Sequence, residues 1–85
     1  MALVPMQMGL SVVYHKQQLT FNENGKYIFT GSQNILSAFC ELGNYAILIS
    51  NNLANACFTL YDITGQNWTR VTSQPSIYVI WYTAE

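Results

Sequence analysis

One short stretch of this chain gathers most of the side chains that could recognise a ligand. Residues 62–70 read Asp-Ile-Thr-Gly-Gln-Asn-Trp-Thr-Arg and place an acid, amides, hydroxyls, an indole and an arginine around one expected turn. Sugar recognition uses such a mixture, because an aromatic face covers the apolar C–H side of the ring while planar polar groups bond its hydroxyls. The sequence therefore predicts a ligand-binding site that consists of Trp68, Asn67, Gln66, Asp62 and Arg70.

The same stretch also has a purely structural interpretation. In that interpretation Trp68 is a core residue, and Asp62 and Arg70 form a pair across two neighbouring strands. A second polar patch, made by the asparagines at positions 51, 52 and 55, could also contact a ligand. Asparagine-rich turns usually only reverse the chain, however, so this patch is the weaker candidate.

The other residues offer little for catalysis or metal binding. His15 is the single histidine and is expected as an exposed residue near a strand end, so it makes a poor base for a nucleophile–histidine–acid triad. The acids Glu23, Glu41 and Asp62 belong to separate turns, and nothing in their spacing pairs two carboxylates for glycoside hydrolysis. The histidine and cysteines lack zinc-ligand spacing, and no glycine-rich phosphate loop is present. We therefore expect a protein without enzymatic activity, cofactor or metal.

Charge is scarce along the whole chain. Three basic and four acidic residues stand among 85, and 51% of the residues are hydrophobic. Soluble domains carry charge at about a quarter of their positions, so here neutral amides and hydroxyls must face the water. Such a surface suits neutral polar ligands and does not repel a second copy. It also lacks the basic stripe that nucleic acid or an anionic membrane surface would require.

The length suits one domain, 1–85, and its local pattern is that of β-structure. Short β-favouring segments alternate with turn clusters of Asn, Gly and Pro, which predicts an all-β antiparallel sandwich, jelly-roll-like, with about eight strands. Asn24-Gly25 is the clearest hairpin signal, and the only helical alternative covers Gln33–Leu42. The expected strands are Leu10–Tyr14, Gln18–Phe21, Lys26–Thr30, Ile35–Cys40, Tyr45–Ser50, Cys57–Asp62, Trp68–Thr72 and Ile77–Tyr82.

Two of these strands, 45–49 and 77–82, are apolar on both faces. A small sandwich buries one face of each strand, so the second face must pack against loops or against another subunit. Because charge is scarce, we expect the subunit, which predicts a homo-oligomer, dimeric or trimeric. Trp81 and Tyr82 are expected in the core or at that interface rather than at a ligand.

The N-terminal segment and the cysteines complete the prediction. Met1–Val13 is apolar but has no basic residue before Lys16 and is interrupted by Pro5 and Gly9, so we expect neither a signal peptide nor a spanning helix. Cys40 and Cys57 lie in apolar runs and are expected as buried free thiols. A disulfide between neighbouring strands stays open as the alternative.

Four features give the chain a family resemblance: the Asn24-Gly25 turn, the Asn51-Asn52 pair, the turn over 65–68 and the terminal strand over 77–82. In these features and in its charge-poor, amide-rich composition it resembles the small β modules at the distal ends of bacteriophage tail fibres and tailspikes. The resemblance implies a virion protein that trimerises, binds host surface glycan and accompanies a parent fibre protein. No family motif matches position by position, so no site residue is carried over.

The expected function is therefore a non-enzymatic, oligomeric carbohydrate- or receptor-binding module. A purely structural virion assembly or decoration subunit is the alternative, with the same neutral surface buried against copies of itself or a partner. A small inhibitor of a host enzyme is a third interpretation, which the paucity of charge disfavours.

Overall fold

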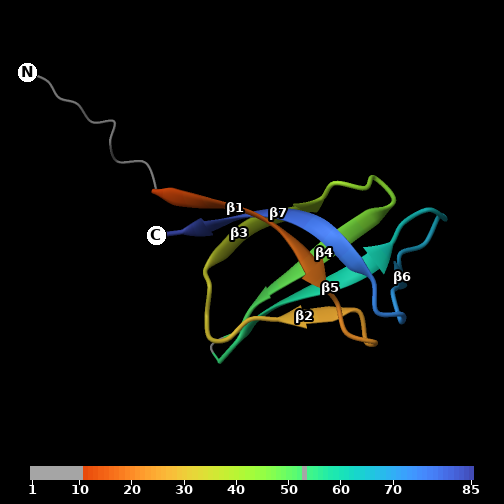
Figure 1. Ribbon diagram of the computed structural model, residues 1–85, viewed down its shortest axis with the longest axis horizontal. Helices are drawn as coiled ribbons and strands as arrows, with labels where there is room; N and C mark the ends of the chain where they lie inside the picture. The colour runs from red at the N-terminus through yellow and green to blue at the C-terminus, as the bar shows by residue number, and fades with distance from the viewer. Residues whose placement is uncertain (1–10, 53) are drawn as a thin grey trace, which may run out of the picture.

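The computed structural model describes residues 11–52 and 54–85, which form strands joined by turns and loops (Figure 1). All pairings are antiparallel and make two sheets. The first sheet has the order β1-β7-β3, and the second has the order β2-β5-β4 with the short β6 also paired to β5. The all-β antiparallel prediction is confirmed, with seven strands in place of about eight. The strands are β1 (Val12–Thr20), β2 (Lys26–Ile28), β3 (Ile35–Cys40), β4 (Tyr45–Asn51), β5 (Ala56–Asp62), β6 (Thr69–Arg70) and β7 (Ser76–Ala84).

Two of the expected strands are one continuous strand. The sequence predicts a break over residues 15–17, but β1 pairs with β7 without interruption, from Val12 opposite Ala84 to Thr20 opposite Ser76. The equally long β7 offers a backbone partner to every residue of β1, and this pairing overrides the weak β-preference of the Lys and Gln residues in the middle. Leu10, the first residue of the expected strand, lies outside the described residues.

The alternative helix over Gln33–Leu42 is wrong. Its central residues are β3, which pairs with β7 on the side away from β1, with a register shift between Ile35 and Ser37. Asn34, the expected helix cap, has a φ of 51° and accepts a hydrogen bond from the backbone N–H of Ala84 at 3.0 Å. Pairing with β7 decides for the strand, because that edge of β7 would otherwise leave its backbone polar groups without partners.

The expected turn at Asn24-Gly25 is present, but the expected hairpin ladder is not. The Asn22 side chain accepts hydrogen bonds from the backbone N–H groups of Asn24 (2.8 Å) and Lys26 (3.1 Å), and Gly25 has a φ of 73°. The strands on either side, however, join different sheets. The turn therefore carries the chain from one sheet to the other, which leaves Leu19 and Phe21 buried at the beginning of the crossover.

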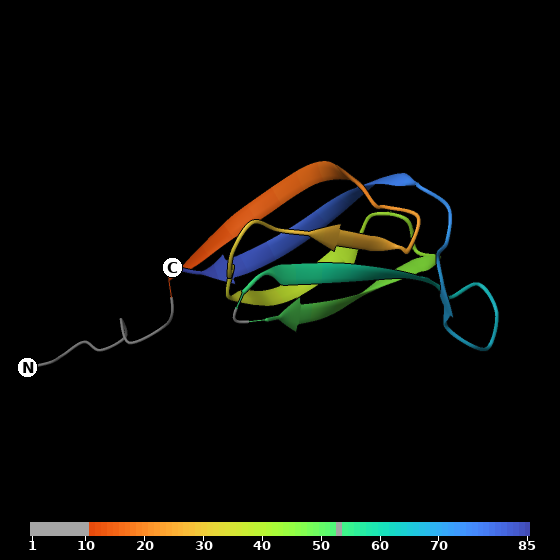
Figure 2. The same ribbon diagram turned by 90° about the horizontal axis from the view of Figure 1, so that it is seen from below.

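One hydrophobic core lies between the two facing sheets (Figure 2). The ring of Phe58 contacts those of Phe29, at a centroid distance of 5.0 Å, and Trp81, at 5.7 Å, both edge to face. Phe58 and Leu60 point inward from β5, which confirms the predicted alternation, and the layered arrangement is compatible with a sandwich. The buried core side chains are Leu19, Phe21, Ile35, Ala56, Phe58, Leu60, Ile77, Val79 and Trp81.

A side-chain amide joins the two sheets at one corner. Asn51, the last residue of β4, accepts a hydrogen bond from the backbone N–H of Ile35 and donates one to its carbonyl, both at 2.9 Å. The Asn51 amide thus bonds both backbone groups of Ile35, as a neighbouring strand would do. These groups need such a partner because Ile35 is buried. Asn51, one of the three residues of the predicted polar patch, therefore has a structural role.

Replacement of Asn51 by alanine is expected to lower the free energy of unfolding by about 2–3 kcal/mol, because it removes two hydrogen bonds and leaves both backbone groups of Ile35 unpaired. Urea unfolding followed by circular dichroism measures the change. Asn52→Ala is the matched control: the Asn52 side chain accepts from the exposed backbone N–H of Ala54 at 3.2 Å, and its loss should cost less than about 0.5 kcal/mol. Equal losses for the two variants would contradict this role of Asn51.

The two strands with apolar residues on both faces, β4 and β7, each have one face in the core and one face exposed to solvent. On β7, Val79 is fully buried, whereas Tyr78 on the opposite face is 49% exposed. On β4, Ile47 packs against the core and Leu48 on the opposite face is 55% exposed. No described strand or loop lies over these outer faces, so each sheet presents a partly apolar surface outward (Figure 2).

Candidate functional site

The predicted site lies at one end of the second sheet, where a loop over residues 63–68 joins β5 to β6. Trp68 is 58% exposed, so the interpretation of it as a core residue is wrong. Its indole lies against the ring of Tyr61, with centroids 5.6 Å apart and an angle of 49° between the planes. The neighbouring ring contacts the indole and leaves much of its surface to solvent.

Asp62 and Arg70 do not form the cross-strand pair of the structural interpretation. Asp62 stands opposite Thr69, and Arg70 stands opposite Tyr61. Consecutive strand residues point to opposite faces, so Asp62 and Tyr61 are on different sides of the sheet. Arg70 is therefore grouped with Tyr61 and Trp68, and Asp62 is separated from them.

Asp62 holds the loop instead. Its carboxylate accepts hydrogen bonds from the backbone N–H of Thr64 at 2.9 Å and from the Thr64 hydroxyl at 2.6 Å, which closes a tight local turn. These two bonds hold the pKa of Asp62 below its ordinary value, because they stabilise the ionised form. Asp62 is thus a positioning residue for the segment that carries Gln66, Asn67 and Trp68.

Gln66 and Asn67 are exposed on the same loop. Neither side chain makes a hydrogen bond to another described residue, so both amides are free to bond a ligand. The structure therefore brings Trp68, Gln66, Asn67 and Arg70 to one end of the second sheet and assigns Asp62 to the support of the loop.

A depression of about 290 Å³ lies further along the outer face of the same sheet. Thr59 stands between Cys57 and Tyr61 on the outward side of β5, so the strand connects the depression with the Trp68 loop. Asn52 and Asn55 of the predicted polar patch line this depression, and their side-chain oxygens accept hydrogen bonds from the backbone N–H groups of Ala54 and Gly31. The lining residues are Lys26, Ile28, Ser50, Asn52, Asn55, Cys57 and Thr59.

The sequence did not identify three residues near the candidate site: Tyr61, which contacts Trp68, and Lys26 and Thr59, which line the depression. Alternation predicts that each faces outward from its strand. Their grouping depends on the register that puts Lys26 opposite Thr59, and on β6 folding back onto β5 beside Tyr61. The sequence signal that could have found these three residues is their outward position on expected strands near the Trp68 loop.

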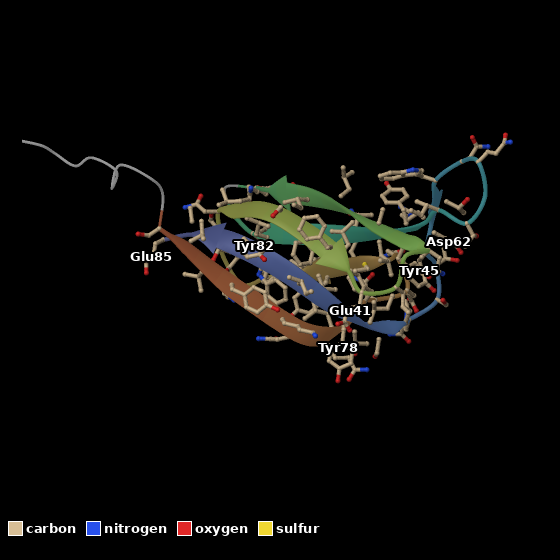
Figure 3. The ribbon with its side chains drawn as sticks, turned by 90° about the horizontal axis from the view of Figure 1, so that it is seen from above. Glu41, Tyr45, Asp62, Tyr78, Tyr82 and Glu85 are labelled. Atoms are coloured by element: carbon tan, nitrogen blue, oxygen red, sulfur yellow. The ribbon has the colours of Figure 1, made fainter. Side chains whose placement is uncertain are left out.

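The outer face of the first sheet differs from this site. Its aromatic residues include Tyr14, whose ring lies 5.6 Å from that of Tyr82, together with Tyr78 and Phe39, which is 55% exposed. Figure 3 shows Tyr78 and Tyr82 along β7, with Glu41 beside Tyr78. Lys16 and Glu41 meet across this face at 2.8 Å, so its charges cancel. The pKa of Lys16 is raised by its hydrogen bond with Glu41.

His15 is not the exposed residue near a strand end that the sequence predicts. It lies within β1 on the core side, stacked on Trp81 with a centroid distance of 4.9 Å and an interplanar angle of 10°. Its Nε2 forms a 2.8 Å hydrogen bond with the hydroxyl of Thr83, which is buried. The histidine covers the end of the core, since β7 supplies both of its partners.

Both cysteines are free thiols, as predicted, and half-buried rather than fully buried. Burial raises the pKa of Cys40 to about 11, so the thiol stays protonated at neutral pH. Cys57 points outward from β5 into the wall of the depression. Within the described ranges, no three His, Cys, Asp or Glu side chains gather in a way that could hold a metal ion.

Comparisons with known proteins give no match: no protein-family model, curated protein or solved structure is similar to this chain. Residues 11–52 and 54–85 include no helix that could cross a membrane.

Proposed function

We propose that this chain is a non-enzymatic, oligomeric module that binds carbohydrate or a glycosylated receptor on the outer face of its second sheet. The observation that carries the proposal is Trp68, which is 58% exposed and held by Tyr61 beside unpaired amides. A large aromatic side chain held in place at the surface is suited to a partner that covers it. The flat indole fits the apolar face of a sugar ring.

Each residue of the predicted site has a role in this proposal. Trp68 is the stacking platform, and Asn67 and Gln66 bond the sugar hydroxyls, since amides both donate and accept. Arg70 stands opposite Tyr61, whose ring contacts Trp68. Asp62 acts through the loop, because its carboxylate is engaged with Thr64.

The outer face of the first sheet serves self-association in the same proposal. Its exposed aromatic residues, Tyr14, Phe39 and Tyr78, are large, and its one ion pair is internally neutral. A second copy meets such a face without charge repulsion and removes apolar surface from water. We favour a trimer, as the tail-fibre resemblance implies.

The wider setting belongs to the same proposal. We place the chain in a virion, as a tail-fibre or tailspike module that accompanies a parent fibre protein and binds host surface glycan. The two facing sheets support a sandwich, and a jelly-roll-like connection of the strands is its proposed finer form.

The test is a glycan array followed by calorimetric titration of the oligosaccharides that bind. Trp68→Ala is expected to weaken binding by about 10- to 30-fold, because a central aromatic contact contributes about 1.4–2 kcal/mol or more. Trp68→Phe retains a flat ring and should keep most of the affinity. Because Trp68 is largely exposed, both variants should unfold at the same urea concentration as the parent.

Unchanged affinity in Trp68→Ala would contradict the site, and the absence of any glycan ligand would contradict the function. The alternative, a purely structural virion subunit, is favoured by the exposed aromatic residues of the first sheet. It predicts stable oligomers by light scattering and no glycan binding, so the same protein preparation distinguishes the two.

A further inference from the structure

The second sheet carries two cations next to each other on its outer face. Lys26 stands opposite Thr59, and Arg70 stands opposite Tyr61, on the same side of β5. Directly opposed residues share a face of a sheet, and Thr59 and Tyr61 both face outward. Two residues of strand separate the pairs, so the backbones of Lys26 and Arg70 are about 7 Å apart along the strand direction.

A second observation places the Arg70 side chain beside the residue that precedes Lys26. The Cγ atom of Arg70 lies 3.4 Å from the position that a Cβ atom on Gly25 would occupy, and Gly25 immediately precedes Lys26. The apolar part of the arginine thus runs over the turn that begins β2. Its guanidinium remains at the surface, since Arg70 is exposed.

Neither cation has an anionic partner among the described residues. The one ion pair there joins Lys16 to Glu41 on the first sheet. The carboxylate of Asp62 is engaged with Thr64. Residues 1–10 and 53 contain no Asp or Glu, so they bring no further carboxylate side chain. In a chain with three basic residues, two are therefore placed together on the proposed glycan face without a counter-charge.

We infer that the glycan carries a carboxylate, which binds between Lys26 and Arg70 while its sugar ring stacks on Trp68. The inference rests on the proposed function and specifies its ligand as an acidic oligosaccharide. The planar guanidinium of Arg70 matches a carboxylate with two parallel hydrogen bonds, and the ammonium of Lys26 adds a point charge. Trp68 and Arg70 both adjoin Tyr61, so a single sugar unit reaches both.

Two cations suit a single anionic group rather than a polyanion. A nucleic acid or a strongly sulfated chain is held by rows of Lys and Arg along its length, and the net charge of this chain is −1. The neutral side chains nearby, including Thr59, Asn52 and Asn55, are suited to hydroxyls. The chemistry of this face therefore favours a mostly neutral sugar chain with an occasional carboxylate.

The experiment compares each acidic oligosaccharide with its neutral counterpart. The probes are sialyllactose and trigalacturonate, each against the same oligosaccharide with its carboxyl groups reduced to alcohols, titrated by calorimetry. The unsubstituted chain should bind at least one acidic probe about tenfold or more tightly than its neutral counterpart. Lys26→Gln and Arg70→Gln should each reduce this preference, and the double variant should abolish it.

Lys16→Gln is the matched control, because Lys16 is a cation of the first sheet and is already paired. It should keep the full preference. Equal affinity for acidic and neutral probes, or a preference that survives in the double variant, would overturn the inference and leave the proposed function standing. If neither these probes nor any glycan of the array binds, both the proposed function and the inference are overturned.

Discussion

Replacement of Gly25 by alanine is expected to lower the free energy of unfolding by about 2–5 kcal/mol, a large part of the total for a domain of this size. Gly25 has a φ of 73°, which costs an alanine about 1–2 kcal/mol. A Cβ atom there would also collide with the carbonyl oxygen of Val71. Because that oxygen belongs to the backbone, relief requires the strands to move, at a further cost of about 1–3 kcal/mol.

The contacts of Leu60 explain why this space is so tight. Its backbone N–H donates to the carbonyl of Gly25 at 2.7 Å, and its carbonyl accepts from the N–H of Val71 at 3.0 Å. The turn before β2 and the segment after β6 thus meet on the same side of β5. Only a glycine leaves room for both.

Gly31→Ala is the matched control for this prediction. Gly31 also has a positive φ, 84°, but no atom lies within 4 Å of the position of its missing Cβ. Gly31→Ala should lower the free energy of unfolding only by the conformational cost of the positive φ, about 1 kcal/mol. Urea unfolding followed by circular dichroism measures both variants, and equal losses would contradict a steric role for Gly25.

Replacement of Phe39 by glutamate is expected to convert the proposed oligomer into monomers. Phe39 is 55% exposed on the outer face of the first sheet and lies opposite Ile80 of β7. Symmetry would bury one new carboxylate from every subunit close to Glu41, and Lys16, the cation across β7 on this face, is already paired with Glu41. The cost of several kcal/mol weakens association by at least about 100-fold.

Light scattering coupled to size-exclusion chromatography measures the mass of each form. Leu48→Glu is the matched control, because Leu48 is also 55% exposed but lies on the outer face of the second sheet. It should keep the parent mass. A monomeric parent protein would contradict the proposed self-association, and loss of the oligomer in Leu48→Glu would contradict its assignment to the first sheet.

Local patterns predicted much of this fold. The alternation of Phe58 and Leu60 with their neighbours correctly identified inward and outward residues on β5, because a strand has a strict period of two. The Asn22–Gly25 turn was also predictable, since an Asn side chain and a glycine with positive φ act within a few residues. These features need no information about distant parts of the chain.

Long-range pairing explains what could not be predicted. The role of His15 depends on Thr83, which is 68 residues away, and the continuity of β1 over residues 15–17 depends on its pairing with β7. The division of the strands on either side of Asn24-Gly25 between two sheets has the same origin. In each case the competing local preference was overridden by a partner that the sequence order does not identify.

The candidate site shows the same division. The exposed loop with Trp68, Gln66 and Asn67 follows from its own composition, whereas Lys26 joins it through the register of β2 on β5. The sequence predicts Asp62 at the same site as Trp68 because the two are close in the chain. The pleat of β5 places Asp62 on the opposite face of the sheet from Tyr61. There its carboxylate accepts a hydrogen bond from the backbone N–H of Thr64.

The two tryptophans have opposite surroundings, and this gives the protein two intrinsic optical reporters. Trp81 is 4% exposed and packed among Phe29, Phe58 and His15, so its emission follows the integrity of the interior. Trp68 is 58% exposed beside Tyr61, so its emission responds to whatever approaches the loop. Unfolding and surface occupancy can therefore be observed separately in the unlabelled chain, each through a different indole.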